Sequence, residues 1–90
     1  MTLIRYRVKP GRAEENAELV RAVYAELAEL AAPGVRYVTF RDGDTFMHVS
    51  FGESPTTVPA FARFREGLEE RCEEPPRVVS DAIGAYGLEA

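Results

Sequence analysis

His48 is the only histidine in the chain, and Tyr37 is the side chain that we expect to find beside it. Both lie in runs rich in β-branched and aromatic residues, at positions 35–40 and 45–51, which predict two strands. Histidine titrates near neutral pH, and a phenol within hydrogen-bond reach can exchange a proton with it. Such a catalytic pair suits an oxygenase, isomerase or cyclase acting on an acidic phenol or enol. The alternative is a hydrogen-bonded pair within the sheet or at an interface between two copies.

The pairing follows from Asp42-Gly43, which separates the two runs. This dipeptide favours a tight type I′ turn, in which both central residues have positive φ. With the dipeptide at the tip, residues whose numbers sum to 85 face each other, so Tyr37 is expected opposite His48. A two- or four-residue loop keeps the two side chains on one face of the sheet, whereas a three-residue loop would separate them.

Arg5 and Arg7 are candidate ligand-binding residues, because they share one face of the strand predicted over residues 2–9. Two guanidinium groups on one face can bind a carboxylate or an enolate-like ligand. The alternative is a structural role, in which both groups face solvent or pair with an acid such as Asp81.

Tyr6 and Tyr86 combine an aromatic ring with a polar tip, and are candidates to line a pocket for a flat molecule. Their spacing also fits core positions. The single Cys72 has no second cysteine or histidine at ligand spacing, so it is interpreted as a small core residue. We expect no metal site and no cofactor.

These residues are carried by five predicted segments: a strand over 2–9, a helix over 12–32, the strand pair, a helix over 58–73 and a strand over 78–88. Pro33-Gly34 and Pro75-Pro76 are expected to end the helices, and Thr57 to cap the second. The order β-α-β-β-α-β predicts an α+β, ferredoxin-like fold, with two helices on one face of an antiparallel sheet. Residues 1–90 are expected to form a single domain.

The two faces of the hairpin differ in composition, which predicts how the layers stack. The more apolar face is expected to pack under the helices; it carries Val38, Phe40, Met47, Val49 and Phe51. The other face bears Val35, Tyr37 and Phe46, which is too much apolar surface to leave bare in a monomer. Stacking a second sheet on that face predicts a homodimer.

Bulk properties exclude several classes of partner. The net charge of −4 and the absence of a basic run argue against a nucleic-acid partner. No apolar run approaches the roughly 18 residues needed to span a bilayer, so no membrane role is expected. The first ten residues alternate in polarity, unlike a signal peptide, and we expect a cytoplasmic location.

Four segments carry a resemblance to a known family, at residues 6–12 (YRVKPGR), 33–37 (PGVRY), 45–49 (TFMHV) and 60–64 (AFARF). With these segments the chain resembles the antibiotic-biosynthesis-monooxygenase-like branch of the dimeric α/β-barrel superfamily. It implies a dimeric α/β barrel in which ligands sit between each sheet and its covering helices.

The family's catalytic residues do not transfer to this chain. The resemblance implies an Asn acting with a Trp, joined in haem-degrading relatives by a His on the second helix. This chain has no Trp, its only Asn is Asn16, and its only His is expected on a strand. We therefore expect a protein that binds a small aromatic or enolic molecule and resembles cofactor-independent monooxygenases. The alternatives are a non-catalytic binding or structural homodimer, or an accessory subunit of a larger enzyme complex.

Overall fold

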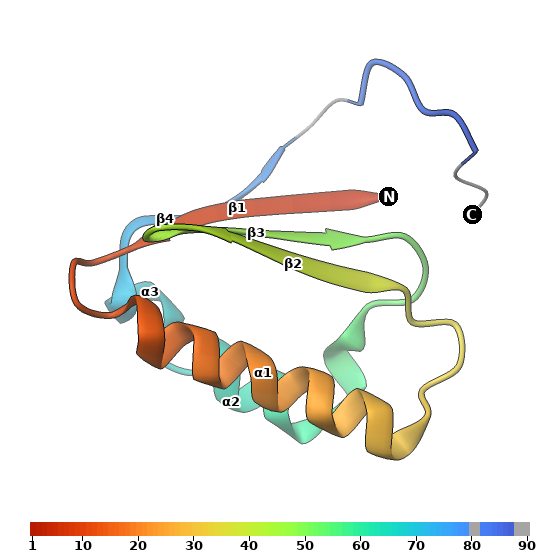
Figure 1. Cartoon of the computed structure of the whole chain (residues 1–90), viewed down its shortest axis with the longest axis horizontal. Coiled ribbons are helices and arrows are strands. Elements are labelled where there is room, and N and C mark those ends of the chain that lie inside the picture. Colours follow the sequence, from red (N-terminus) through yellow and green to blue (C-terminus); the bar gives the residue numbers. More distant parts are fainter. Residues whose placement is uncertain (80–81, 88–90) are drawn as a thin grey trace.

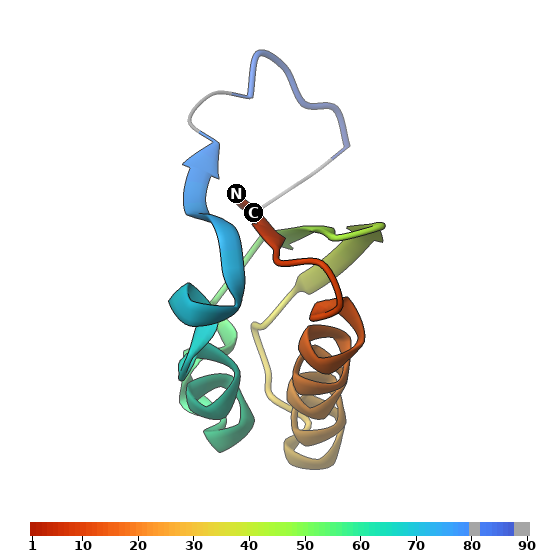
Figure 2. The same ribbon diagram turned by 90° about the vertical axis from the view of Figure 1, so that its left-hand side faces the viewer.

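A four-stranded antiparallel sheet with its helices on one face forms the fold, as predicted (Figure 1). The computed structural model describes residues 1–79 and 82–87. The strand order is β2-β3-β1-β4, and α1 lies beside α2 and α3 beneath the sheet (Figure 2). The elements are β1 Thr2–Val8, α1 Ala13–Leu30, β2 Tyr37–Asp42, β3 Thr45–Ser50, the 3-10 turn η1 Pro55–Thr57, α2 Pro59–Arg65, α3 Leu68–Arg71 and β4 Cys72–Val79.

Helix α1 matches its predicted span to within two residues at each end. Small and β-branched residues at helical spacing face the sheet, including Ala17, Val20 and Val23, and Asn16 is buried among them. The helix ends before Pro33-Gly34, because Ala31 adopts a left-handed conformation with φ of 48°.

The second predicted helix is wrong in its C-terminal half. Helix α2 ends at Arg65, Gly67 takes a positive φ of 73°, and the single-turn helix α3 follows. The chain becomes extended at Cys72, so Pro75-Pro76 lies inside β4 instead of ending a helix. Prolines are tolerated there because β4 is an edge strand.

The last strand therefore ends at Val79, whereas it was predicted to begin at residue 78. Residues 82–87 do not form a strand. Positions 80, 81 and 88 of the predicted strand lie outside the described residues.

The N-terminus of α2 is capped by a residue from α1 and not by the predicted Thr57. The cap position is Val58, whose side chain makes no capping hydrogen bond. Instead Ala60 N–H donates to Glu26 Oε1 at 2.8 Å, and Arg63 pairs with the same carboxylate at 2.6 Å. These contacts lower the pKa of Glu26, the hydrogen bond from the Ala60 backbone most of all. Glu26 thus ties the two helices together.

The hairpin turn is formed by Gly43 and Asp44, one residue further along than predicted. Of the two turn residues only Gly43 has a positive φ, at 60°, and Asp42 remains in the strand. Glycine at the first central position with a non-positive second φ fits a type II′ turn better than type I′.

The register of the hairpin is consequently shifted by two residues from the prediction. Opposed residues have numbers that sum to 87, so His48 is opposite Thr39 and Tyr37 is opposite Ser50. The expected direct opposition of Tyr37 and His48 is wrong. Because an even shift keeps every side chain on its own face, the two residues still share a face of the sheet.

The face of the hairpin that packs under the helices is the reverse of the predicted one. Phe46 and His48 are 1% and 5% exposed and lie in the covered layer. The neighbouring strand explains this, because Tyr6 of β1 is paired with Phe46 and belongs to the same core. Polar groups on this face bond to one another, which removes most of the cost of burying them.

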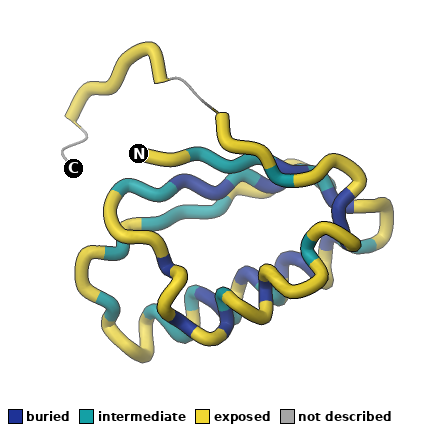
Figure 3. The backbone as a smooth tube through the Cα atoms, turned by 180° about the vertical axis from the view of Figure 1, so that it is seen from behind, coloured by how far each residue is buried: buried dark blue, intermediate teal, exposed yellow. Residues whose placement is uncertain are grey.

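The open face of the sheet carries both apolar and charged side chains. Phe40 is 54% exposed and Val79 is 42% exposed. Arg5 and Arg7 project from the same face, and Glu74 pairs with both. Figure 3 shows the exposed positions concentrated in the loops and along β4. No helix in the described part of the chain is long and apolar enough to cross a membrane.

Candidate functional site

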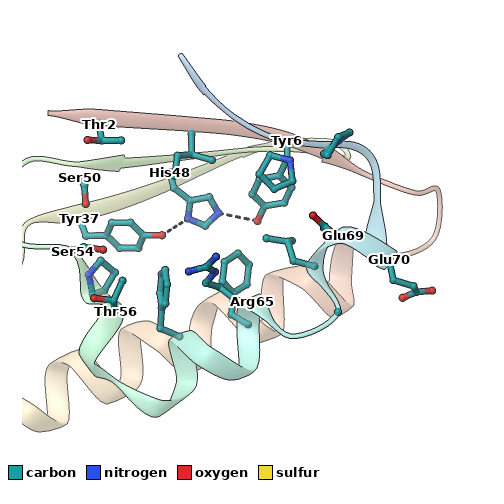
Figure 4. A pocket seen from close by; sticks show the side chains of 18 residues that line it. Thr2, Tyr6, Tyr37, His48, Ser50, Ser54, Thr56, Arg65, Glu69 and Glu70 are labelled. Atoms are coloured by element: carbon teal, nitrogen blue, oxygen red, sulfur yellow. Dashed lines mark hydrogen bonds between the residues drawn. The ribbon is translucent and has the colours of Figure 1, made fainter. Parts of the chain in front are cut away.

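A cavity of about 860 Å³ lies between the covered face of the sheet and the helices α2 and α3 (Figure 4). The strands contribute Tyr6, Tyr37 and His48, and α2 contributes Phe61 and Phe64. The remaining lining residues are Thr2, Ile4, Ser50, Ser54, Pro55, Thr56, Arg65, Gly67, Leu68, Glu69, Glu70, Pro75 and Pro76.

His48 is held between two phenols. Its Nε2 lies 2.8 Å from Tyr6 Oη, and its Nδ1 is hydrogen-bonded to Tyr37 Oη. Thr39 Oγ1 is 3.1 Å from the same Nδ1, and Tyr24 Oη is 2.8 Å from Thr39 Oγ1. Both ring nitrogens are therefore occupied, and the imidazole has a fixed orientation.

The hydrogen bonds continue from Tyr6 into the core. Asn16 Nδ2 donates to Tyr6 Oη at 2.8 Å, and Arg71 Nε donates to Asn16 Oδ1 at 3.1 Å. Arg71 also donates to the carbonyls of Glu66 and Phe64, at 3.0 and 2.6 Å. We call the series Tyr37, His48, Tyr6, Asn16, Arg71 the polar chain.

Arg71 is buried, at 3% exposure, and is held by polar and aromatic groups. Among the ion pairs of the described residues none joins Arg71 to a carboxylate. Its guanidinium instead lies 5.7 Å from the centre of the Phe64 ring, a cation–π contact. A buried cation held in this way is a fixed source of hydrogen-bond donors.

Burial sets the protonation state of the titrating groups in the polar chain. It lowers the pKa of His48 to about 4, so the imidazole is neutral at pH 7. Burial likewise raises the pKa of Tyr6 and of Tyr37 well above the ordinary value for a phenol. At neutral pH the site therefore presents neutral hydrogen-bonding groups, and His48 is a weaker base than a solvent-exposed histidine.

Aromatic rings form the walls around these polar atoms. The His48 ring stacks between those of Tyr6 and Tyr37, with centroid distances of 5.3 and 5.7 Å. Phe64 packs at a tilt against His48 from the helix side, with a centroid distance of 5.3 Å. Flat walls with a few polar atoms are typical of a pocket for an aromatic or conjugated molecule.

Three of the six predicted site residues come together at this cavity: His48, Tyr37 and Tyr6. Arg5 and Arg7 lie on the opposite face of the sheet, where Glu74 pairs with them at 3.8 and 2.8 Å. The acid suggested for them, Asp81, lies outside the described residues.

Tyr86, the sixth predicted residue, is 100% exposed and is absent from the cavity lining. It follows β4 in a segment that runs on the side of the sheet away from the helices (Figure 1).

Sequence reasoning missed Asn16 and Arg71. Asn16 carried a signal, because it falls at helical spacing between Ala13 and Val20 on the buried stripe of α1. A polar residue at such a position needs a partner in the core. Arg71 carried none, since it lies in a stretch rich in charged residues that reads as a solvated surface.

Comparison with known proteins bears on the fold. No protein-family model and no curated protein matches the chain. The crystal structure of an antibiotic biosynthesis monooxygenase is similar, with a TM-score of 0.70 and 16% identity over 92% of this chain and 97% of that one. A candidate antibiotic biosynthesis monooxygenase from Nitrosomonas europaea gives 0.72 and 16% over the same shares. Another from Chloroflexus aurantiacus J-10-fl gives 0.61 and 15%, over 98% and 97%.

The chain therefore has the ferredoxin-like fold of antibiotic-biosynthesis-monooxygenase-like proteins, as its sequence resemblance indicated. At this level of identity the likeness concerns the fold alone.

Proposed function

We propose that the protein binds a small aromatic or enolic molecule in the cavity between the sheet and α2, with Tyr37 contacting its reacting oxygen and His48 holding Tyr37 in place. The observation that carries the proposal is the opening of the Tyr37–His48 pair onto a cavity of about 860 Å³ walled by aromatic rings. A structural pair would serve equally well in a filled core, and this space is large enough for a two-ring molecule.

The roles of the two residues follow from their protonation states. The pKa of His48 near 4 makes it a poor base toward a neutral phenol, so it serves mainly to hold and polarise Tyr37. Tyr37 lines the cavity, and its hydroxyl is the group of this pair that can meet a ligand oxygen. Hydrogen bonding to a phenol or enol oxygen is the interaction that this arrangement supports best.

Binding in the cavity is tested by filling it. The side chain of Ser54 lines the cavity, so Ser54→Trp should abolish binding of a two-ring probe such as 1-tetralone. Ala62→Trp is the matched control, because Ala62 is exposed on α2 and is not part of the lining. Titration of the ¹⁵N-labelled protein, followed by backbone amide shifts, measures both. Equal affinity of the two variants would contradict the proposal.

We also propose that two copies associate through the open face of the sheet. Phe40 and Val79 expose apolar surface there, and Arg7 Nε is buried without a hydrogen-bond partner. A second sheet stacked on this face would cover the apolar side chains and could supply an acceptor for Arg7. The interface lies on the side of the sheet away from the cavity, so a purely structural dimer would leave the cavity free. Sedimentation equilibrium giving a mass near 10.0 kDa at micromolar concentration would contradict it.

A further inference from the structure

Along the polar chain each hydrogen bond runs from a donor to an acceptor, and this donor-to-acceptor direction is fixed at the buried end. The Arg71 guanidinium has only hydrogen-bond donors, so the atom facing its Nε must be the oxygen of the Asn16 amide. The NH₂ group of Asn16 then faces Tyr6 and donates to its Oη. Arg71 therefore decides which way the Asn16 amide points.

Tyr6 passes this direction to His48. In the described part of the chain the Tyr6 hydroxyl bonds only to Asn16 and to His48 Nε2. Since it accepts from Asn16, its single proton has one available acceptor, which is Nε2. A proton on Nε2 instead would leave the buried Tyr6 hydroxyl hydrogen without any acceptor, which is costly.

His48 passes the direction on to the cavity. With Nε2 accepting, the neutral imidazole carries its proton on Nδ1, which donates to Tyr37 Oη and Thr39 Oγ1. Tyr37 then accepts from His48, and its own proton can turn toward Thr39, its other hydrogen-bond partner, or toward a ligand in the cavity that it lines (Figure 4).

We propose that Arg71 and Asn16 are positioning residues that fix His48 as its Nδ1–H tautomer, and that the pocket consequently selects a ligand presenting an acceptor oxygen, such as a carbonyl, phenolate or enolate, to Tyr37. The ligand class rests on the proposed function, whereas the tautomer is a property of the free protein. The two parts can therefore be tested separately.

The tautomer is measured by long-range ¹H–¹⁵N correlation of the imidazole ring, and the single histidine makes the assignment unambiguous. We expect a protonated Nδ1 and an unprotonated Nε2 at pH 7 in the parent protein. The opposite pattern overturns the inference, whatever the protein binds. This measurement needs no variant.

Asn16→Asp should reverse the polar chain. A carboxylate beside Arg71 can only accept hydrogen bonds, so it would accept one from the Tyr6 hydroxyl. Tyr6 would then accept from His48 Nε2–H, leaving Nδ1 to accept the proton of Tyr37. We expect the ring spectrum of the folded variant to switch to the Nε2–H tautomer. An unchanged tautomer overturns the role of Asn16. Tyr37→Phe is the control; it leaves Thr39 to accept from Nδ1 and should keep the parent tautomer.

Ligand class is tested with 1-tetralone and tetralin, which differ by one carbonyl oxygen. We compare the Kd of tetralin divided by the Kd of tetralone in each variant. This ratio should be about tenfold higher in the parent than in Asn16→Asp or Tyr37→Phe, because the parent makes one more hydrogen bond to the carbonyl. Equal ratios overturn the ligand class. If neither probe binds the parent, the proposed function is contradicted, while the tautomer result stands by itself.

Discussion

Acidification from pH 8 to pH 5 should destabilise the fold mainly through His48. In the folded protein burial lowers the pKa of His48 to about 4, whereas in the unfolded chain it returns to about 6.5. The unfolded state therefore binds a proton that the folded state excludes. The stabilisation is fully present above pH 6.5 and is lost progressively as the pH falls toward 4.

The magnitude follows from the difference between the two pKa values. The free energy of unfolding is lower by about 3 kcal/mol below pH 4, and by about 2 kcal/mol already at pH 5. His48 is only 5% exposed, so solvent screening reduces this little. Carboxylates with lowered pKa, such as Glu26, add to the loss mainly below their ordinary pKa of 4.5, which is why the comparison stops at pH 5.

Urea unfolding at pH 8, 7, 6 and 5 measures the effect as a change in the free energy of unfolding. His48→Gln is the control, because it removes the titrating ring and keeps a polar side chain in the same place. It should be less stable at pH 8 but nearly flat down to pH 5. A flat profile in the parent protein, or an equally steep one in His48→Gln, would refute the assignment of a neutral, buried histidine.

Four further substitutions test the turn, the polar chain and the two faces of the sheet. Gly43→Val should cost about 1–3 kcal/mol in thermal or urea unfolding, because a β-branched residue resists the φ of 60°; coincident melts would count against the turn. Tyr6→Phe should cost about 1–3 kcal/mol by the same measurement, since it leaves Asn16 without its acceptor and Nε2 without its donor. Phe40→Asp should weaken self-association in sedimentation equilibrium without unfolding the chain, whereas Phe46→Asp should unfold it, because Phe46 is 1% exposed.

The sequence was sufficient for the order of the elements and for the fold. Apolar residues at helical spacing predict α1, and the alternation around a glycine turn predicts the hairpin. The predicted second helix extends too far toward the C-terminus. Periodicity alone does not show that Gly67 breaks the helix or that Pro75-Pro76 can lie in an edge strand. Tertiary context decides both points.

The site was predictable only in part. The prediction that Tyr37 and His48 share one face is correct despite a register error of two residues, since side chains along a strand alternate with a period of two. Tyr6 as the second partner of His48 depends on the pairing of β1 with β3, which links residues far apart in the chain. No local pattern specifies that register.

The reversed sheet faces have one physical cause, and it bears on how the protein associates. Counting apolar residues favoured burial of the face with Phe40, yet the buried face is the one where each polar group has a partner, from Tyr37 to Arg71. A satisfied polar chain can be buried at little cost, so apolar count alone does not choose between two mixed faces. Because the helices cover that face, the apolar side chains left over are those around Phe40, and the expected dimer interface moves to them. If Phe40→Asp and the parent protein sediment alike as dimers, the second copy binds elsewhere.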